Sequence, residues 1–115
     1  MSVRLTVYVY TTDLERLRRF YAAGLGIEPG TQHGNWLPFE LGGATFALHG
    51  VSEPGDRDLQ RANLNFETDD IEALVSRCEA AGATVLRGVS DEAFGKRAVL
   101  RDPDGRTFEA VSHGA

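Results

Sequence analysis

One carboxylate, Glu109, lies in the middle of a segment whose pattern predicts a β-hairpin. Asp102 to Gly105 read Asp-Pro-Asp-Gly, which is typical of a tight turn, and strand-like residues stand on both sides. Side chains alternate along a strand, so Phe108 and Ala110 share one face and Glu109 points to the other. Such a carboxylate either lies in solvent or lines a cleft, where it could meet a cationic group or take part in acid–base chemistry.

Aromatic side chains form a second group able to bind a small molecule. Tyr8 and Tyr10 alternate with valines near the start of the chain, and Trp36 follows a His-Gly turn signal. Their rings offer flat apolar faces for stacking, each with one hydrogen-bonding group. Large aromatic side chains seldom point at solvent together without a partner. We interpret them as lining a ligand cleft, with packing at a dimer contact as the alternative for Trp36.

A sheet must position these side chains, and the hydrophobic periodicity of the first half predicts its strands. Residues 3–10 alternate apolar and polar side chains, as a half-buried strand does. Residues 14–21 carry apolar side chains at helical spacing, with Asp13 as the N-cap and Gly26 beyond the end. Residues 27–49 contain three turn signals, and we expect three short strands there.

The same order of elements is predicted for the second half. After a polar stretch, the patterns indicate a strand over residues 63–68, a helix over 71–78, a strand near 85–86, a loop over 88–95 and the hairpin over 97–111.

A weak internal repeat connects the two halves. Shifting the chain by 57 residues places Thr11 on Thr68 and Asp13 on Asp70. We therefore expect two βαβββ modules in tandem. Module one covers about residues 1–50, a linker covers 50–61 and module two covers about 62–115, together forming a single domain.

The helix of each module should cover the apolar strand faces, which leaves a polar and aromatic face. This face either meets water, as one face of an antiparallel sheet often does, or lines a ligand cleft. We favour the cleft, and Phe94 in the neighbouring loop either covers it or anchors its own loop. The expected ligand-binding residues are Tyr8, Tyr10, Trp36, Glu40, His49, Asn63, Asn65, Phe94 and Glu109.

Composition excludes several classes of partner. The chain of 115 residues has a net charge of −5 and no cluster of Lys and Arg, so we expect no nucleic-acid partner. Its longest apolar run is too short to cross a bilayer and no signal peptide is apparent, so we expect no membrane partner. The single cysteine, Cys78, suits a reducing cytoplasm, where we place the protein, and we interpret it as a small apolar residue of a helix.

Taken together, these motifs resemble the vicinal oxygen chelate superfamily, which includes glyoxalase I, bleomycin resistance proteins and extradiol dioxygenases. The resemblance rests on Thr12-Asp13-Leu14-Glu15, Phe20-Tyr21, Gly24-Leu25-Gly26, Asp69-Asp70-Ile71, Ala81-Gly82-Ala83, Asp102-Pro103-Asp104-Gly105 and Phe108-Glu109. It implies an α+β fold in which two tandem βαβββ modules form a curved mixed sheet around a cleft, with the helices on the convex side. It also implies a homodimer, with or without exchange of modules through the linker.

Metal-dependent members of this superfamily hold a divalent ion on four strand residues. The matching positions here are Thr6, Ala47, Asn63 and Glu109, of which only Glu109 is a typical ligand. His33 and His49 are more simply interpreted as a turn and a strand-end residue than as replacement ligands. We therefore expect no metal, no cofactor and no catalytic residue.

The resulting prediction is a non-enzymatic binding protein that resembles bleomycin resistance proteins. It would sequester an aromatic ligand such as an antibiotic, with or without a cationic group, in a metal-free cleft. The alternatives are a metal-dependent or metal-free lyase, isomerase or dioxygenase, and an accessory module that acts through its dimer surface.

Overall fold

The computed structural model describes residues 5–52 and 64–113 of the chain. Within these residues the elements are β1 (Thr6–Thr11), α1 (Leu14–Leu25), β2 (Trp36–Leu41), β3 (Ala44–Gly50), β4 (Leu64–Glu67), α2 (Ile71–Ala80), β5 (Thr84–Glu92), β6 (Gly95–Arg101) and β7 (Thr107–His113). Residues 53–61 of the predicted linker, and Asn63, lie outside the described ranges.

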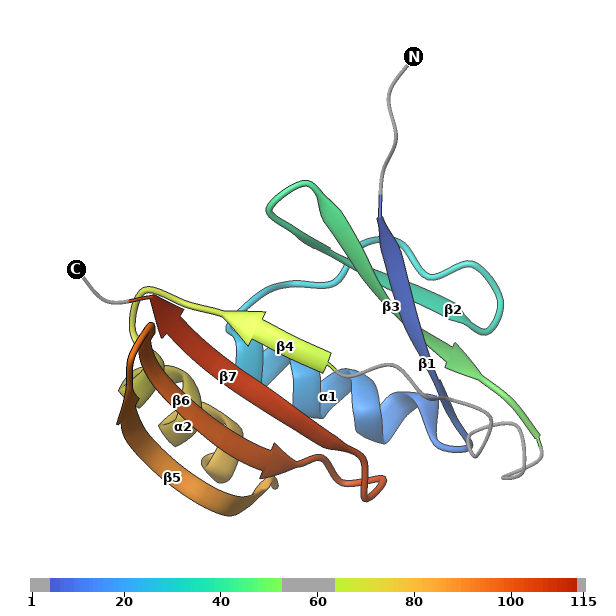
Figure 1. The fold of residues 1–115 in the computed structure, drawn as a ribbon. Helices are drawn as coiled ribbons and strands as arrows, with labels where there is room; N and C mark the ends of the chain where they lie inside the picture. Colours follow the sequence, from blue (N-terminus) through green and yellow to red (C-terminus); the bar gives the residue numbers. More distant parts are fainter. Residues whose placement is uncertain (1–4, 53–63, 114–115) are drawn as a thin grey trace.

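The strands form two mixed sheets, one for each module (Figure 1). Sheet A has the strand order β1-β3-β2, and sheet B has the order β4-β7-β6-β5. In both sheets the first strand of the module pairs in parallel with its last strand, and the other pairs are antiparallel. The predicted α+β fold of tandem modules is confirmed.

Equivalent side chains cap the two helices. Asp13 accepts a hydrogen bond from the backbone N–H of Arg16, and Asp70 accepts one from the N–H of Ala73, each at 3.1 Å. Before them, the hydroxyls of Thr11 and Thr68 each accept the N–H of the cap residue. The repeat seen in the sequence is therefore a repeat of helix-starting geometry.

The prediction of three strands in residues 27–49 is wrong, because the described chain forms two, β2 and β3. Ahead of β2 there is a single bridge in which His33 and Trp36 exchange backbone hydrogen bonds. Further along, Gly30 donates to the carbonyl of Pro38 at 2.8 Å. Since Pro38 has no N–H to donate in return, the ladder on this side of β2 does not extend.

The predicted loop over residues 88–95 is also wrong in most of its length. β5 runs on to Glu92, with register shifts on either side of Arg87, and only Ala93 and Phe94 remain between β5 and β6. An irregular strand of this kind absorbs a glycine such as Gly88 as part of a bulge.

The core lies where α1 meets both sheets. The ring of Tyr21 in α1 contacts Phe46 of sheet A, and Phe66 and Phe108 of sheet B, with centroid separations of 5.0 to 6.1 Å. Helix α1 also packs on α2, close enough that a Cβ at Gly24 would lie 3.0 Å from the Cys78 Sγ. One aromatic cluster thus holds the modules together.

No helix in the described ranges is long and apolar enough to cross a membrane.

Candidate functional site

The outward side of sheet A carries a cluster of aromatic rings, here called the aromatic face: Tyr8, Tyr10, Trp36 and His49. The strand register places His49 between Tyr10 on β1 and Trp36 on β2. The ring of Tyr8 lies 5.3 Å from Trp36, 5.5 Å from Tyr10 and 6.1 Å from His49, measured between centroids. Four residues predicted from the sequence to bind a ligand therefore form one cluster, in which each ring contacts at least two others.

A small residue, Ala47, and a buried nitrogen, Nδ1 of His49, lie among the rings of the aromatic face. Ala47 points to the same side and pairs with Tyr8 and Pro38, yet it is 0% exposed, so neighbouring side chains cover its methyl group. Nδ1 of His49 is buried and has no hydrogen-bond partner among the described residues. Tyr8 remains 42% exposed. The rings thus pack on one another over a small residue while part of the cluster stays open to solvent.

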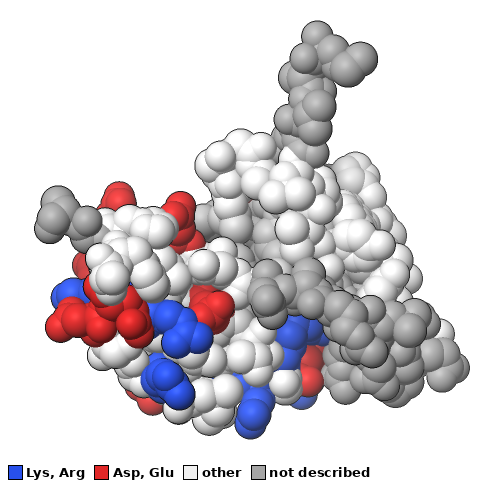
Figure 2. Space-filling view, viewed as in Figure 1, with Lys and Arg blue, Asp and Glu red and all other residues white. Residues whose placement is uncertain are grey.

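The outward side of sheet B is different, and is here called the charged face: Asn65, Glu67, Arg97, Glu109 and His113. Asn65 pairs with Glu109, and Nε of Arg97 donates to Oε1 of Glu109. Nε2 of His113 lies 2.5 Å from Oε1 of Glu67. In Figure 2, charged side chains gather over this module, whereas the described surface around sheet A is almost entirely white.

The outward-facing carboxylates that could meet a cationic ligand already have partners within the chain. Glu109 is held by Arg97, and Glu67 lies beside His113. Glu40 accepts a hydrogen bond from the Thr45 hydroxyl at 2.9 Å. These contacts weaken the case for a cationic group, because each carboxylate is partly neutralised or satisfied before a ligand arrives.

Sequence reasoning missed Arg97, although a signal for it existed. Counting back from the Asp102 to Gly105 turn pairs Arg97 with Val111, on the same side of the hairpin as Glu109. Two predicted residues remain. Phe94 is 45% exposed at the β5–β6 turn, and the centroid of its ring lies 5.9 Å from that of His113. Asn63 is outside the described ranges.

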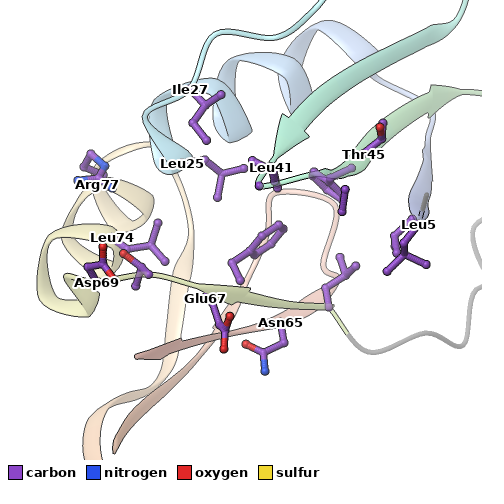
Figure 3. A pocket seen from close by; sticks show the side chains of 17 residues that line it. Leu5, Leu25, Ile27, Leu41, Thr45, Asn65, Glu67, Asp69, Leu74 and Arg77 are labelled. Atoms are coloured by element: carbon purple, nitrogen blue, oxygen red, sulfur yellow. The ribbon is translucent and has the colours of Figure 1, made fainter. Parts of the chain in front are cut away.

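A further hollow lies between the modules and is here called the inter-module groove. It has a volume of about 750 Å³. Figure 3 shows Leu25, Ile27, Leu41 and Leu74 around it, whereas Asn65 and Glu67 point away from this apolar lining. Leu5, an apolar residue of the alternating pattern over residues 3–10, lies at the groove and is 64% exposed. The groove depends on how the modules are placed, which no local pattern in the sequence encodes.

A buried polar network beside the core fixes the relative position of the modules. Asp102, 3% exposed, accepts the Tyr21 hydroxyl at 2.8 Å and Nη1 of Arg106 at 3.0 Å. Nη2 of Arg106 in turn donates to the carbonyl of Tyr10 at 2.5 Å. Burial, together with the neighbouring Asp102 carboxylate, raises the pKa of Tyr21 well above its ordinary value. The β6–β7 turn is thereby tied to α1 and to the strand that carries the aromatic face.

The residues at the metal positions of the superfamily do not fit a divalent ion. Ala47 has no donor atom and is fully buried, and Thr6 offers only a neutral hydroxyl. Glu109 is bound to Arg97, whose positive charge opposes a cation at the same carboxylate. We therefore derive no chemical step through a metal.

Comparisons with known proteins agree with this architecture. The family model described as glyoxalase-like domain matches residues 6–111. A glyoxalase/bleomycin resistance protein from Albidiferax ferrireducens T118 is 25% identical, with a TM-score of 0.80 over 98% of this chain and 100% of that one. No curated protein matches the sequence.

Two further solved structures share the fold. TnmS3 from Streptomyces sp. CB03234, described as an antibiotic binding protein, is 22% identical, with a TM-score of 0.78 over 99% of this chain and 98% of that one. A glyoxalase-related enzyme from Fulvimarina pelagi is also 22% identical, with a TM-score of 0.78 over 98% of this chain and 89% of that one. Binding proteins and enzymes are thus both described on this fold, so function must be argued from the residues of the site.

Proposed function

Since this chain belongs to the glyoxalase-like domain family, within the vicinal oxygen chelate superfamily, we propose that it binds a small aromatic molecule, such as an antibiotic, without transforming it. The observation that carries the proposal is the aromatic face, where rings from three adjacent strands touch one another and stay partly exposed. Rings held in this way give a stacking surface at little conformational cost. The likeness to TnmS3, described as an antibiotic binding protein, lends support.

The proposal includes a homodimer, with or without exchanged modules. In the described part of the chain β1 and β4 are edge strands of their sheets, and both border the inter-module groove. Edge strands offer backbone groups for pairing with another chain. A two-fold axis that sets β1 of one copy against β4 of its partner forms the same contact twice and closes the assembly. The aromatic face of one copy could then meet the charged face of its partner to form a cleft.

The dimer is tested by sedimentation equilibrium. Leu5→Asp places a charge beside the groove, so we expect it to weaken self-association by at least tenfold. Leu86→Asp is the matched control, because Leu86 is also an exposed leucine, 44% against 64%, but does not line the groove. A monomeric wild-type protein, or equal effects of the two variants, would contradict the proposed dimer.

Ligand binding is tested through the single tryptophan, Trp36. We expect its fluorescence to change on titration with at least one member of a panel of glycopeptide and planar aromatic antibiotics. Calorimetry should then show weaker binding by Tyr8→Ala and unchanged binding by Leu86→Ala, which removes a side chain of similar exposure, 44% against 42%. No response across the panel would contradict the proposal.

The competing enzymatic prediction has its own test. Elemental analysis of protein purified without chelator would find a stoichiometric divalent metal if the chain were a metal-dependent lyase or dioxygenase. The proposal expects none, since Arg97 occupies the carboxylate of Glu109. A bound metal that is lost in Glu109→Gln would reverse the conclusion.

A further inference from the structure

A buried nitrogen lies inside the aromatic face without a hydrogen bond. Nδ1 of His49 is shielded from solvent and has no partner among the residues that the structure describes. Buried polar atoms of proteins are nearly always paired with protein groups, ordered water or a ligand, because an unpaired one forfeits its hydration. Because these rings are proposed to bind a ligand, the unpaired nitrogen indicates that the ligand supplies a hydrogen-bonding group.

The surroundings of His49 define where a ligand atom would have to arrive. Its ring lies 5.4 Å from that of Tyr10 and 5.9 Å from that of Trp36, its neighbours on the two adjoining strands. These neighbours present ring faces and edges to the imidazole. A polar ligand group placed between them would be screened from water. In such a place a hydrogen bond discriminates most strongly between a ligand that can form it and one that cannot.

The body of such a ligand would lie over the residue before Leu48 on the same strand, in place of a ring that now covers it. Ala47 contributes only a methyl group, and its cross-strand neighbours on this face are Tyr8 and Pro38. At 42% exposure Tyr8 is the most exposed of the four rings, so it is the ring that such a ligand would displace. A flat ring that takes its place would rest over Ala47 beside Trp36, with one edge toward His49.

We propose that the ligand is a hydroxylated planar aromatic molecule whose hydroxyl hydrogen-bonds to Nδ1 of His49. This inference rests on the proposed function and narrows its ligand class to phenols. A hydroxyl donates to Nδ1 when the imidazole proton is on Nε2, and accepts from Nδ1 when the proton is there, so it serves either tautomer. A purely hydrocarbon ring would leave the nitrogen buried and unpaired.

The test compares two probes of nearly the same shape, 2-naphthol and 2-methylnaphthalene. Each is titrated into ¹⁵N-labelled wild-type protein while the indole N–H signal of Trp36, the single tryptophan, is followed. We expect 2-naphthol to bind about tenfold more tightly, the usual value of one hydrogen bond that the other probe cannot make. Equal affinities would overturn the role of His49 and leave aromatic binding standing, whereas silence with both probes and with the antibiotic panel would overturn the proposed function itself.

His49→Phe then locates the discriminating atom. The substitution keeps a ring in the cluster and removes both nitrogens, so we expect the preference for 2-naphthol to disappear while 2-methylnaphthalene binds as before. His33→Phe is the matched control, because His33 is exposed and bridges to Trp36 only through its backbone. A preference retained in His49→Phe would contradict the inference, and the comparison of probes on the wild-type protein does not depend on how this variant folds.

Discussion

Module one, from β1 to β3, and module two, from β4 to β7, share a frame that consists of a capped helix and a parallel pair of first and last strands. They differ in their outward faces and in that the described part of sheet B has one strand more than sheet A. The cap residues Asp13 and Asp70 have φ and ψ of −138° and 79°, and −136° and 86°. In each module the first strand pairs with the last strand in the same register. Tyr8 on β1 lies opposite Ala47 on β3, and the equivalent Asn65 on β4 lies opposite Glu109 on β7. The helix caps and the pairing of first and last strands are therefore common to the two modules.

On the outward faces, the equivalent positions carry unlike chemistry. Ala47 corresponds to Glu109, and His49 corresponds to Val111, which is buried at 4% exposure. One module offers rings for stacking, and the other offers ion pairs. Because outward side chains contribute little to the frame, they can diverge while the fold is kept, and this is why we look for function on these faces.

The largest expected effect comes from the β6–β7 turn, where module two has a buried carboxylate. Aligning Thr107 with Thr45 matches the buried Asp102 to the exposed Glu40. Asp102→Ala removes the carboxylate that pairs with the Arg106 guanidinium, whose side chain is only 12% exposed. We expect a loss of about 3–5 kcal/mol in the free energy of unfolding, measured by urea denaturation.

Glu40→Ala is the control for this substitution, with an expected change within about 0.5 kcal/mol, as for most exposed sites. Similar losses in the two variants would mean that the buried Asp102 network contributes no more than an exposed carboxylate and does not hold the modules together.

Equivalent buried groups of the two helices predict a shared sensitivity to alkali. Tyr21 in α1 corresponds to Cys78 in α2, and burial raises the pKa of both, that of Cys78 to about 11. The unfolded chain releases these protons first, near pH 10 for tyrosine and about 8.5 for cysteine. Stability present below those values is therefore lost as the pH rises toward the folded pKa values, at about 1.4 kcal/mol per pH unit for each proton.

Tyr21→Phe should reduce the slope of the free energy of unfolding against pH above about pH 10, and Cys78→Ala should reduce it between about pH 8.5 and 11. Urea midpoints measured across that range check the slopes. A variant with the same slope as the wild-type protein would show that its side chain titrates alike in the folded and unfolded states.

The helix caps should give the closest match between the modules. Asp13→Ala and Asp70→Ala each remove one side-chain acceptor at 3.1 Å, and we expect each to lower the free energy of unfolding by about 1 kcal/mol. Urea denaturation of the two variants should agree to within about 0.5 kcal/mol. A several-fold difference would mean that one helix depends on its cap while the other is held by packing.

Local patterns account for what the sequence could predict. A cap needs one side chain and a turn needs four residues, so Asp13, Asp70 and the turn that begins at Asp102 could be placed correctly. The strand faces could also be predicted, because alternation places Tyr8 and Tyr10 on one side wherever the strand ends.

What the sequence did not predict depends on partners far along the chain. The ladder beside β2 stops because Pro38 cannot donate, and this matters only once Gly30 is known to lie opposite. β5 continues through Gly88 because β6 offers it a partner. The inter-module groove follows from the contacts of Tyr21 with both sheets, which no single segment contains.

The smallest expected effect concerns the ion pair that has no counterpart in module one. The side chains of Arg97 and Glu109 are 31% and 28% exposed, so solvent screens their attraction. A double-mutant cycle with Arg97→Gln and Glu109→Gln should give a coupling below about 1 kcal/mol in the free energy of unfolding, and added salt should reduce it. A coupling several times larger would make this pair part of the frame, and only module one would then have an outward face free to serve a ligand.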